Sequence, residues 1–294
     1  MNYRKHAYLI LAHNELPLLE FLVSCLDYEE NDIYIHIDRK ASYDGTSIKT
    51  KKSKLIFLPE RWDARWGDIT LVQIQLELLE LAFQKGIYVY YHFLSGVDLP
   101  LKSQKYIHSF CLENRGKEFI GFVNDRDIES EINRRMRYRH IFAKRFQNRN
   151  VFIRLLRKLF LEIQIIGGFV RNKQIHFRKG PQWCSITDDF AAYLLSCKPE
   201  IMRIFSHTYA PDEFFVQTIC WNSRFRERIY NPDDEFEGCL RFINWKNGIL
   251  QPFNDSDIDR MFKSDKWFAR KFNSKDVDVL NDYKRYYEAY ISRW

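Results

Sequence analysis

Residues 6–38 decide the fold, and their sequence is HAYLILAHNELPLLEFLVSCLDYEENDIYIHID. His6–His13 is a nearly continuous apolar run, which is typical of a strand buried on both faces in a parallel sheet. Asn14 can cap a helix over Glu15–Leu26, and Asp32–Asp38 predicts a second strand. Two strands joined by a helix form a βαβ unit, and ligands of such sheets bind at the carboxyl ends of the strands.

Asp38 ends the second strand, where the ribose or base of a nucleotide would be bound. An acidic residue at a strand end is also a common turn former, and this alternative stays open. Further apolar runs extend the pattern, and together they predict an α/β fold with a mostly parallel sheet flanked by helices. The expected strands are Lys54–Leu58, Tyr88–Leu94, Lys117–Val123 and Leu240–Trp245, with a helix over Ile69–Phe83 and a turn, strand and helix start over Gly180–Asp188.

Size and composition limit the class of protein. A chain of 294 residues without an internal repeat or a linker is expected to form a single domain with a large core. The net charge of +7 and the pI near 9.0 favour acidic partners such as phosphates, nucleotides, anionic lipid or nucleic acid. Six scattered cysteines without a CxxC pair fit reduced thiols in the cytoplasm better than a zinc ribbon or a disulfide framework. With no apolar run as long as a signal peptide or a membrane span, a soluble or surface-associated protein is expected.

Tyr209–Thr218, with the sequence YAPDEFFVQT, holds the candidate catalytic residue. Pro211 suits the first position of a helix, which places Asp212 and Glu213 in the first helical turn. A favourable interaction of acidic residues with the helix dipole is the simplest interpretation. Ala210 offers no side-chain oxygen, so Glu213 is not half of a regular capping box, and an ionised carboxylate there could serve as a general base.

Two other acidic motifs follow predicted strands. Ser95–Ser103, with the sequence SGVDLPLKS, places a glycine and Asp98 directly after a strand, and Ser103 is expected to cap the next helix. Asp125 and Asp127 form a D-x-D pair of the kind that holds a divalent ion in many nucleotide-sugar transferases. The pair is short and opens a charged segment, so an ordinary surface segment is the alternative.

Arg134–Lys158 has ten cations and no acidic residue, and the cations are interleaved with Phe and Leu. This pattern at helical spacing is typical of a helix that lies on an anionic membrane surface. A solvated basic face is the alternative. Nucleic-acid binding comes third, because no recognition motif accompanies the charges.

Seven segments of the chain resemble glycosyltransferase family 14, the core-2/I-branching β-1,6-N-acetylglucosaminyltransferases and peptide xylosyltransferases. They occur in the order of that family and span residues 6–272. The most specific are SGVDLPLKS and PDEFF, and the others are AYLILAHN, IYIHIDRKA, GPQWCSITDDF, LRFINW and FARKF. The resemblance implies a GT-A-like fold, with a nucleotide-sugar part over about residues 1–125 and an acceptor and catalytic part over about residues 126–294.

The resemblance also implies a reaction and a set of site residues. The reaction would be an inverting, metal-independent transfer of a sugar, N-acetylglucosamine first and xylose second, from a UDP-sugar to a hydroxyl of a glycan or lipid-linked glycan. No cofactor is implied. Glu213 would be the catalytic base, Asp38 would contact the nucleoside, Lys271 in FARKF would neutralise the leaving diphosphate, and Asp98 and Trp245 would line the acceptor side.

The sequence departs from the animal members of that family in two respects. They carry a second diphosphate-binding arginine before the FARKF-like segment, where this chain has Gly248–Gln251, so Arg270 or Lys246 would have to supply the second cation. Their membrane anchor, stem and disulfide-rich luminal context are also missing. We therefore expect a bacterial-type enzyme in the cytoplasm, or peripheral on the inner face of the cell membrane.

Three functions are open at this point. The first is the metal-independent transferase, and the second is a metal-dependent transferase that uses Asp125 and Asp127. The third is a non-catalytic basic module that binds membrane or nucleic acid. A glycosidase is a weaker interpretation, because it needs two opposed carboxylates, whereas Asp212 and Glu213 are adjacent and diverge on a helix.

Overall fold

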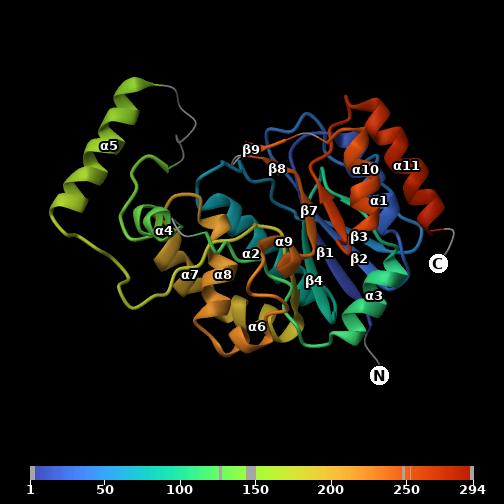
Figure 1. Ribbon diagram of the computed structural model, residues 1–294, viewed down its shortest axis with the longest axis horizontal. Coiled ribbons are helices and arrows are strands. Elements are labelled where there is room, and N and C mark those ends of the chain that lie inside the picture. The colour runs from blue at the N-terminus through green and yellow to red at the C-terminus, as the bar shows by residue number, and fades with distance from the viewer. Residues whose placement is uncertain (1–3, 126–127, 144–149, 247–248, 252, 292–294) are drawn as a thin grey trace.

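The computed structural model describes residues 4–125, 128–143, 150–246, 249–251 and 253–291 (Figure 1). Its main sheet has five strands in the order β3-β2-β1-β4-β6, and β6 runs antiparallel to β4 while the other pairs are parallel. The strands are β1 (His6–Ala12), β2 (Asn31–Ile37), β3 (Lys54–Phe57), β4 (Tyr90–Ser95) and β6 (Ser185–Thr187). This mostly parallel sheet confirms the predicted α/β class and is consistent with a GT-A fold.

Helices cover both faces of the sheet, so its central strands build two cores (Figure 1). On β1, Leu9 and Leu11 face one core, whereas Tyr8 and Ile10 face the other, as the period of two in a strand requires. The first core is completed by α2 (Thr70–Lys85), α6 (Asp188–Ser196), α7 (Lys198–Phe205) and α8 (Phe215–Trp221). The second is completed by α1 (Leu16–Leu26), α3 (Gln104–Glu113), α10 (Asp255–Lys263) and α11 (Val277–Ile291).

A small second sheet packs beside the first in the order β5-β10-β7. Its strands are β5 (Leu99–Pro100), β10 (Phe268–Arg270) and β7 (Arg241–Ile243), and β8 (Trp245–Lys246) and β9 (Ile249–Leu250) form a separate hairpin. The buried Arg241 joins the two sheets, because its Nη2 donates to Ser185 Oγ on β6 at 3.0 Å. The loop from β4 to β5 and the end of β10 are thereby held at one edge of the main sheet.

The remaining elements carry the basic segment and the PDE motif. They are α4 (Ile128–Met136), α5 (Val151–Ile166), α9 (Glu235–Cys239) and two 3₁₀ turns, η2 (Pro211–Glu213) and η3 (Arg224–Arg228). α5 lies at one end of the molecule, standing away from the body (Figure 1). Within the described ranges, no helix has the length and apolar character needed to cross a membrane.

One predicted strand is wrong. Lys117–Val123 makes only isolated bridges, from Glu118 to Ile229 and from Phe119 to Ser185. The backbone N–H groups of Glu118, Phe119 and Val123 donate to three different segments, at Arg228, Ser185 and Lys179, so no continuous ladder forms. The apolar pattern correctly indicated burial, but burial here comes from packing between loops.

Three smaller predictions are corrected. The N-cap of α1 is Glu15 in a left-handed conformation and not Asn14, so the helix begins one residue later than expected. Leu240–Trp245 is divided at Asn244, since β7 pairs with β10 whereas Trp245 belongs to the hairpin. Arg134–Lys158 is not one helix, because α4 ends at Met136 and α5 begins at Val151. The predicted cap at Ser103 is confirmed, since its side chain accepts a hydrogen bond from the Tyr106 N–H. The helix start expected within Gly180–Asp188 is also confirmed, because α6 begins at Asp188.

Candidate active site

The carboxyl end of β2 holds a buried carboxylate. Asp38 follows the strand directly, and its N–H donates to Ala12 O at the end of β1. Its Oδ1 accepts from the backbone N–H of Lys40 at 2.7 Å, and its Oδ2 accepts from that of Ala64 at 3.0 Å. Asp38 therefore forms the turn that the sequence left open as an alternative, and contact with a nucleotide stays a prediction.

Asp98 and Arg270 meet at the same edge of the sheet. Asp98 Oδ1 lies 3.7 Å from Arg270 Nε, and Asp98 Oδ2 accepts from the Ser95 N–H at 2.9 Å. The Arg270 guanidinium also stacks 4.4 Å from the centre of the Trp183 ring. Burial raises the pKa of Asp98, and the Arg270 cation opposes this shift. Asp98 Oδ1 and Arg270 Nη1 are buried without a hydrogen-bond partner among the described residues, so the pair has an open acceptor and an open donor.

Lys271 is exposed and lies close to the ends of β1 and β2. Burial lowers the pKa of His13, the Asp38 carboxylate opposes the shift, and the cations of Lys271 and Lys40 reinforce it. The pKa of His13 therefore depends on charges from two segments that are distant from each other in sequence, residues 38–40 and 270–271. Arg270 is engaged with Asp98 and Trp183, so Lys271 is the more accessible of the two neighbouring cations.

Glu213 lies at the end of the 3₁₀ turn η2 and not in the first turn of a longer helix. Phe214 departs from helical geometry with a φ of −132°, and α8 begins only after it. Glu213 Oε2 accepts from Arg135 Nη2 at 2.8 Å and lies 4.0 Å from Lys179 Nζ. Both cations also pair with Glu131. The candidate base is therefore a partly exposed carboxylate in a cluster of two acids and two cations.

Arg135 contacts the candidate base Glu213, and sequence reasoning missed this contact. The basic-segment interpretation placed it on a membrane-facing surface, but its side chain points inward and is only 11 % exposed. Its guanidinium donates to Tyr209 O and Ala210 O and lies 4.7 Å from the centre of the Phe214 ring. The one signal in the sequence is the i,i+4 spacing of Glu131 and Arg135 on a helix, which predicts an ion pair but not the contact with Glu213.

A loop joins the end of β2 to the turn that carries Glu213. The N–H of Ala64 donates to Asp38, and Gly67 O accepts from the N–H of Ala210 at 3.0 Å, directly before η2. The Trp66 ring packs edge-on against Tyr209 with 5.6 Å between the ring centres. The predicted nucleotide and catalytic residues are therefore connected through a single short segment.

The η2 turn is also held by main-chain contacts at two glycines. The N–H of Gly180 donates to Glu213 O at 2.9 Å. A Cβ atom on Gly180 would lie 2.0 Å from Gly121 O, and one on Gly121 would lie 2.0 Å from Glu235 O. Only glycine at these two positions lets the three backbone segments approach so closely.

Two further carboxyl groups near Glu213 have raised pKa values. Burial and the neighbouring Glu213 charge raise the pKa of Asp212 to about 7. Burial, with Asp125 and Glu213 nearby, raises the pKa of Glu235 to about 7, and the Lys179 cation opposes the shift. Such shifts cluster at functional sites, although structural ion clusters produce them too.

Trp245 and the D-x-D pair are not joined to this cluster. Trp245 is 48 % exposed on the β8–β9 hairpin, and among the described residues no ring contact, hydrogen bond or ion pair links it to the other predicted site residues. Asp127 and the Lys246 side chain lie outside the described parts of the structure. Across the part of the chain that the structure describes, no group of three or more His, Cys, Asp or Glu side chains could hold a metal ion.

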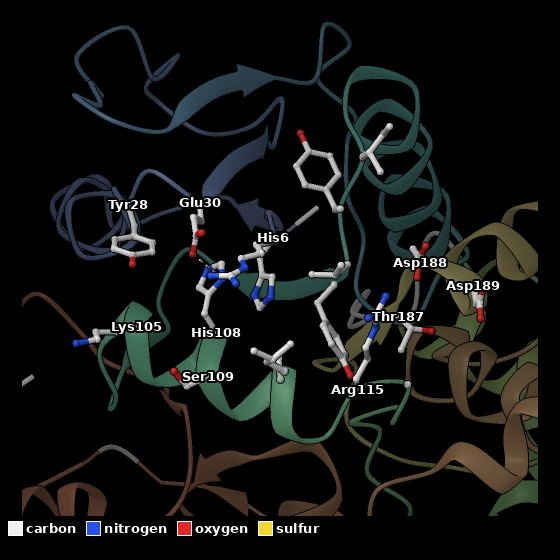
Figure 2. A pocket seen from close by; sticks show the side chains of 18 of the residues that line it. His6, Tyr28, Glu30, Lys105, His108, Ser109, Arg115, Thr187, Asp188 and Asp189 are labelled. Carbon is white, nitrogen blue, oxygen red and sulfur yellow. Dashed lines mark ion pairs between the residues drawn. The ribbon is translucent and has the colours of Figure 1, made fainter. Parts of the chain in front are cut away.

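A cavity lies at the opposite edge, at the amino ends of β1, β2 and β4 (Figure 2). It has a volume of about 640 Å³, and none of the predicted site residues lines it. Figure 2 shows the His6 and His108 rings together on one side of it, with Arg115, Asp188 and Asp189 on the other. The cavity and the sequence motifs therefore lie at opposite ends of the strands. Parallel sheets bind ligands at the carboxyl ends of their strands, where the motif residues are.

A chain of polar side chains runs from this cavity into the sheet. His108 stacks on His6 with ring centres 3.7 Å apart, and His6 Nδ1 lies 2.9 Å from His92 Nε2. His92 Nδ1 lies 2.7 Å from Ser185 Oγ, which also accepts from Arg241. Burial lowers the pKa of all three histidines, that of His108 to about 4, so their rings are neutral at physiological pH.

Comparison with known proteins gives a match over most of the chain. The model of the Core-2/I-branching enzyme family matches residues 6–279. Xylosyltransferase 2 of Rattus norvegicus is 23 % identical over 291 residues, which cover 91 % of this chain and 32 % of the rat protein. Xylosyltransferase oxt of Drosophila pseudoobscura pseudoobscura is 23 % identical over 276 residues, covering 85 % of this chain and 29 % of the fly protein. The chain thus spans about a third of the length of these relatives.

Proposed function

The chain belongs to the Core-2/I-branching enzyme family, and we propose that it is an inverting glycosyltransferase that moves a sugar from a UDP-sugar to a hydroxyl group of a glycan. The observation that carries the proposal is the family match over residues 6–279, which includes every motif that suggested the site. The position of the motif residues supports it, because Asp38, Asp98 and Lys271 all lie at the carboxyl edge of the main sheet.

In the proposed reaction, Glu213 is the general base. The acceptor oxygen attacks the anomeric carbon of the donor, the bond from that carbon to the diphosphate breaks, and UDP leaves with the bonding electrons. The acceptor proton passes to the Glu213 carboxylate. The ion pair with Arg135 supports this role, since the bound guanidinium fixes the orientation of the carboxylate.

The other site residues bind and orient the substrates. Lys271 supplies positive charge to the departing diphosphate, and Asp38 contacts the nucleoside. Asp98 binds a hydroxyl of the acceptor, which is supported by the open acceptor at Asp98 Oδ1. Arg270 is the second cation for the nucleotide-sugar, which is supported by the open donor at Arg270 Nη1. Trp245, exposed on its hairpin, would stack on the acceptor sugar.

The donor sugar is expected to be N-acetylglucosamine, with xylose as the second candidate because the relatives are named xylosyltransferases. A metal-dependent reaction that uses Asp125 and Asp127 is the competing mechanism. The acceptor is expected to be a glycan, free or lipid-linked, and the protein is expected to act in the cytoplasm or at the inner face of the cell membrane.

A nucleotide-sugar screen tests the proposal. Thermal unfolding is measured with UDP, UDP-N-acetylglucosamine and UDP-xylose, with GDP-mannose as the mismatched control, each with EDTA or with Mg²⁺. A ligand that binds the folded state raises Tm, so UDP and one UDP-sugar should raise it equally under both conditions. A rise that needs Mg²⁺ would establish the metal-dependent mechanism. No response to any uridine nucleotide would reject the transferase and leave a non-catalytic basic module.

A further inference from the structure

α5 is attached to the body of the protein along one face only (Figure 1). Leu161 and Gln164 are its buried residues. Gln164 Oε1 accepts from the N–H of Arg139, and Gln164 Nε2 donates to Arg139 O, both at 2.9 Å. Glu162 pairs with Arg134 of α4 at 2.9 Å. The helix is therefore held firmly, and the opposite face projects from the molecule.

The projecting face is apolar. Six side chains between 47 % and 85 % exposed occupy positions i, i+3, i+4, i+7, i+11 and i+14, which form one stripe on an α-helix. They are Phe152, Leu155, Leu156, Leu159, Ile163 and Ile166. Phe169, 64 % exposed, lies just beyond the end of the helix. Single exposed apolar residues are ordinary, but a continuous stripe marks a surface that binds something.

Cations accompany this stripe. Arg154 and Lys158 are exposed on α5, and Arg171 and Lys173 follow Phe169. Burial and the neighbouring Arg139 and Arg203 cations lower the pKa of Arg171, which indicates a crowded positive region. Glu162 is the single acidic residue in α5, and Arg134 already neutralises it. The partner must therefore be apolar and negatively charged.

We infer that the outer face of α5 docks onto an anionic lipid bilayer, with its apolar stripe among the acyl chains and its cations at the headgroups. An interfacial helix of this kind lies in the plane of the membrane, with its apolar face about 5–10 Å deep. Arg154 and Lys158 lie on the side of α5 away from the stripe. A second copy seated on the stripe would leave these cations unmatched, whereas an interfacial helix carries its cations on the polar face at the headgroups. The cations of α4 are not part of this surface, since Arg135 faces Glu213 and Arg134 pairs with Glu162.

The biological role of this docking rests on the proposed function. α4 contacts the proposed base through Arg135, and α5 is bonded to Arg139 just beyond α4. Docking of α5 would thus bring a lipid-linked acceptor and Glu213 to the same membrane surface. Arg157 does not belong in the test, because it is half-buried and interacts with Tyr209, close to the catalytic turn.

Vesicle flotation tests the inference with the full chain. The wild type should float with vesicles of phosphatidylcholine and phosphatidylglycerol at low salt, and should be released at high salt. Pure phosphatidylcholine vesicles should bind it weakly. The variant with Phe152→Ser, Leu159→Ser and Ile163→Ser should lose at least about tenfold in apparent affinity, because buried apolar area drives interfacial binding. Arg154→Glu with Lys158→Glu should abolish the preference for anionic vesicles.

A matched control carries Ile87→Ser, Leu112→Ser and Val277→Ser, three equally exposed apolar residues outside α5, and should bind like the wild type. Wild-type protein that ignores anionic vesicles at low salt overturns the inference, as does a stripe variant that binds as well as the control. A stripe variant that turns a dimer into a monomer instead identifies a second copy as the partner. UDP binding, measured by thermal shift on every variant without vesicles, should not change, so a failure here is distinct from a failure of the proposed transferase.

Discussion

The two edges of the main sheet differ in the ionisable groups that lie at the ends of the central strands. At the carboxyl edge, carboxylates meet cations: Asp98 lies beside Arg270, and Glu213 beside Arg135. At the amino edge, burial keeps His6, His92 and His108 neutral, and His6 and His108 line a cavity there. Two ion pairs, Lys5–Asp32 and Arg228–Asp189, lie at the same edge but outside this chain of histidines. Charge placed beside open polar atoms serves chemistry on anionic and hydroxylated substrates, whereas a neutral hydrogen-bonded chain serves packing. We therefore base the proposed site on the chemistry of the carboxyl edge and not on the presence of a cavity.

Of the single substitutions at the two edges, Glu213→Gln, at the carboxyl edge, should lower turnover the most. Loss of a general base costs about 10²–10⁴ in kcat, and the amide keeps the size of the side chain. UDP affinity should stay near that of the wild type. Single-turnover and steady-state kinetics measure the effect, and more than about a tenth of the wild-type kcat would remove Glu213 from this role. Glu131→Gln, which takes a carboxylate from the same cluster, is the control and should cost much less.

Lys271→Ala should have the next largest effect. A hydrogen bond to a charged group contributes about 1.5–3 kcal/mol, so UDP affinity should fall about tenfold to a hundredfold. Added Mg²⁺ should not restore it. Isothermal titration measures the change, with Lys117→Ala as the control, since that lysine is also exposed and follows Gly116, which lines the amino-edge cavity. Equal affinities in the two variants would show that the proposed diphosphate contact is wrong.

His108→Gln should change the pH dependence of stability. Burial holds the pKa of His108 at about 4, below the value of about 6.5 for an unfolded chain. Between these values the unfolded state binds a proton that the folded state does not, so the free energy of unfolding falls as pH falls through the window. The His108→Gln variant should lack this pH dependence of the free energy of unfolding, which amounts to at most about 1.4 kcal/mol per pH unit. Urea unfolding between about pH 4 and 7 measures the slope, and a slope equal to that of the wild type would contradict the prediction.

Glu235→Gln is the counterpart at the other edge, with the opposite sign. The pKa of Glu235 is raised to about 7 in the folded protein, above the ordinary value of about 4.3. The wild type therefore loses stability as pH rises through this window, because the unfolded state releases the proton first. The Glu235→Gln variant should not lose stability in this way as pH rises, because its amide does not titrate. If both substitutions changed the pH dependence of the free energy of unfolding in the same direction, the contrast between the two edges would be wrong.

Arg115→Ala should have the smallest effect. Arg115 is an exposed residue that lines the amino-edge cavity, where no proposed substrate contact lies. Exposed substitutions of this kind usually change stability by less than about 0.5 kcal/mol. Turnover and UDP affinity should remain within about twofold of the wild type. A larger fall in turnover would mean that the cavity takes part in function.

The sequence predicted the main strands well because burial on both faces leaves a continuous apolar signature, as in His6–Ala12. It could not predict that Asp98 meets Arg270, since 171 intervening residues separate them and only the second sheet brings them together. It also could not separate the inward Arg135 from the outward Arg154, because both belong to one uninterrupted basic run. The prediction of a strand over Lys117–Val123 is wrong for a related reason. Its apolar pattern indicates burial but does not indicate which groups its backbone N–H and C=O groups bond to.

The contact between Gly121 and Gly180 bears on how the specificity of this protein could be redesigned. The main chains of residues 121, 180 and 235 touch directly, and the N–H of Gly180 holds the carbonyl of Glu213. The position of the Glu213 main chain therefore depends on this backbone packing and on the Arg135 side chain, and not on the exposed hairpin that carries Trp245. A mutant library for new acceptors can randomise surface positions such as Trp245 while the proposed base stays in place. The two glycines must be left untouched, because any side chain there would push the catalytic turn out of position.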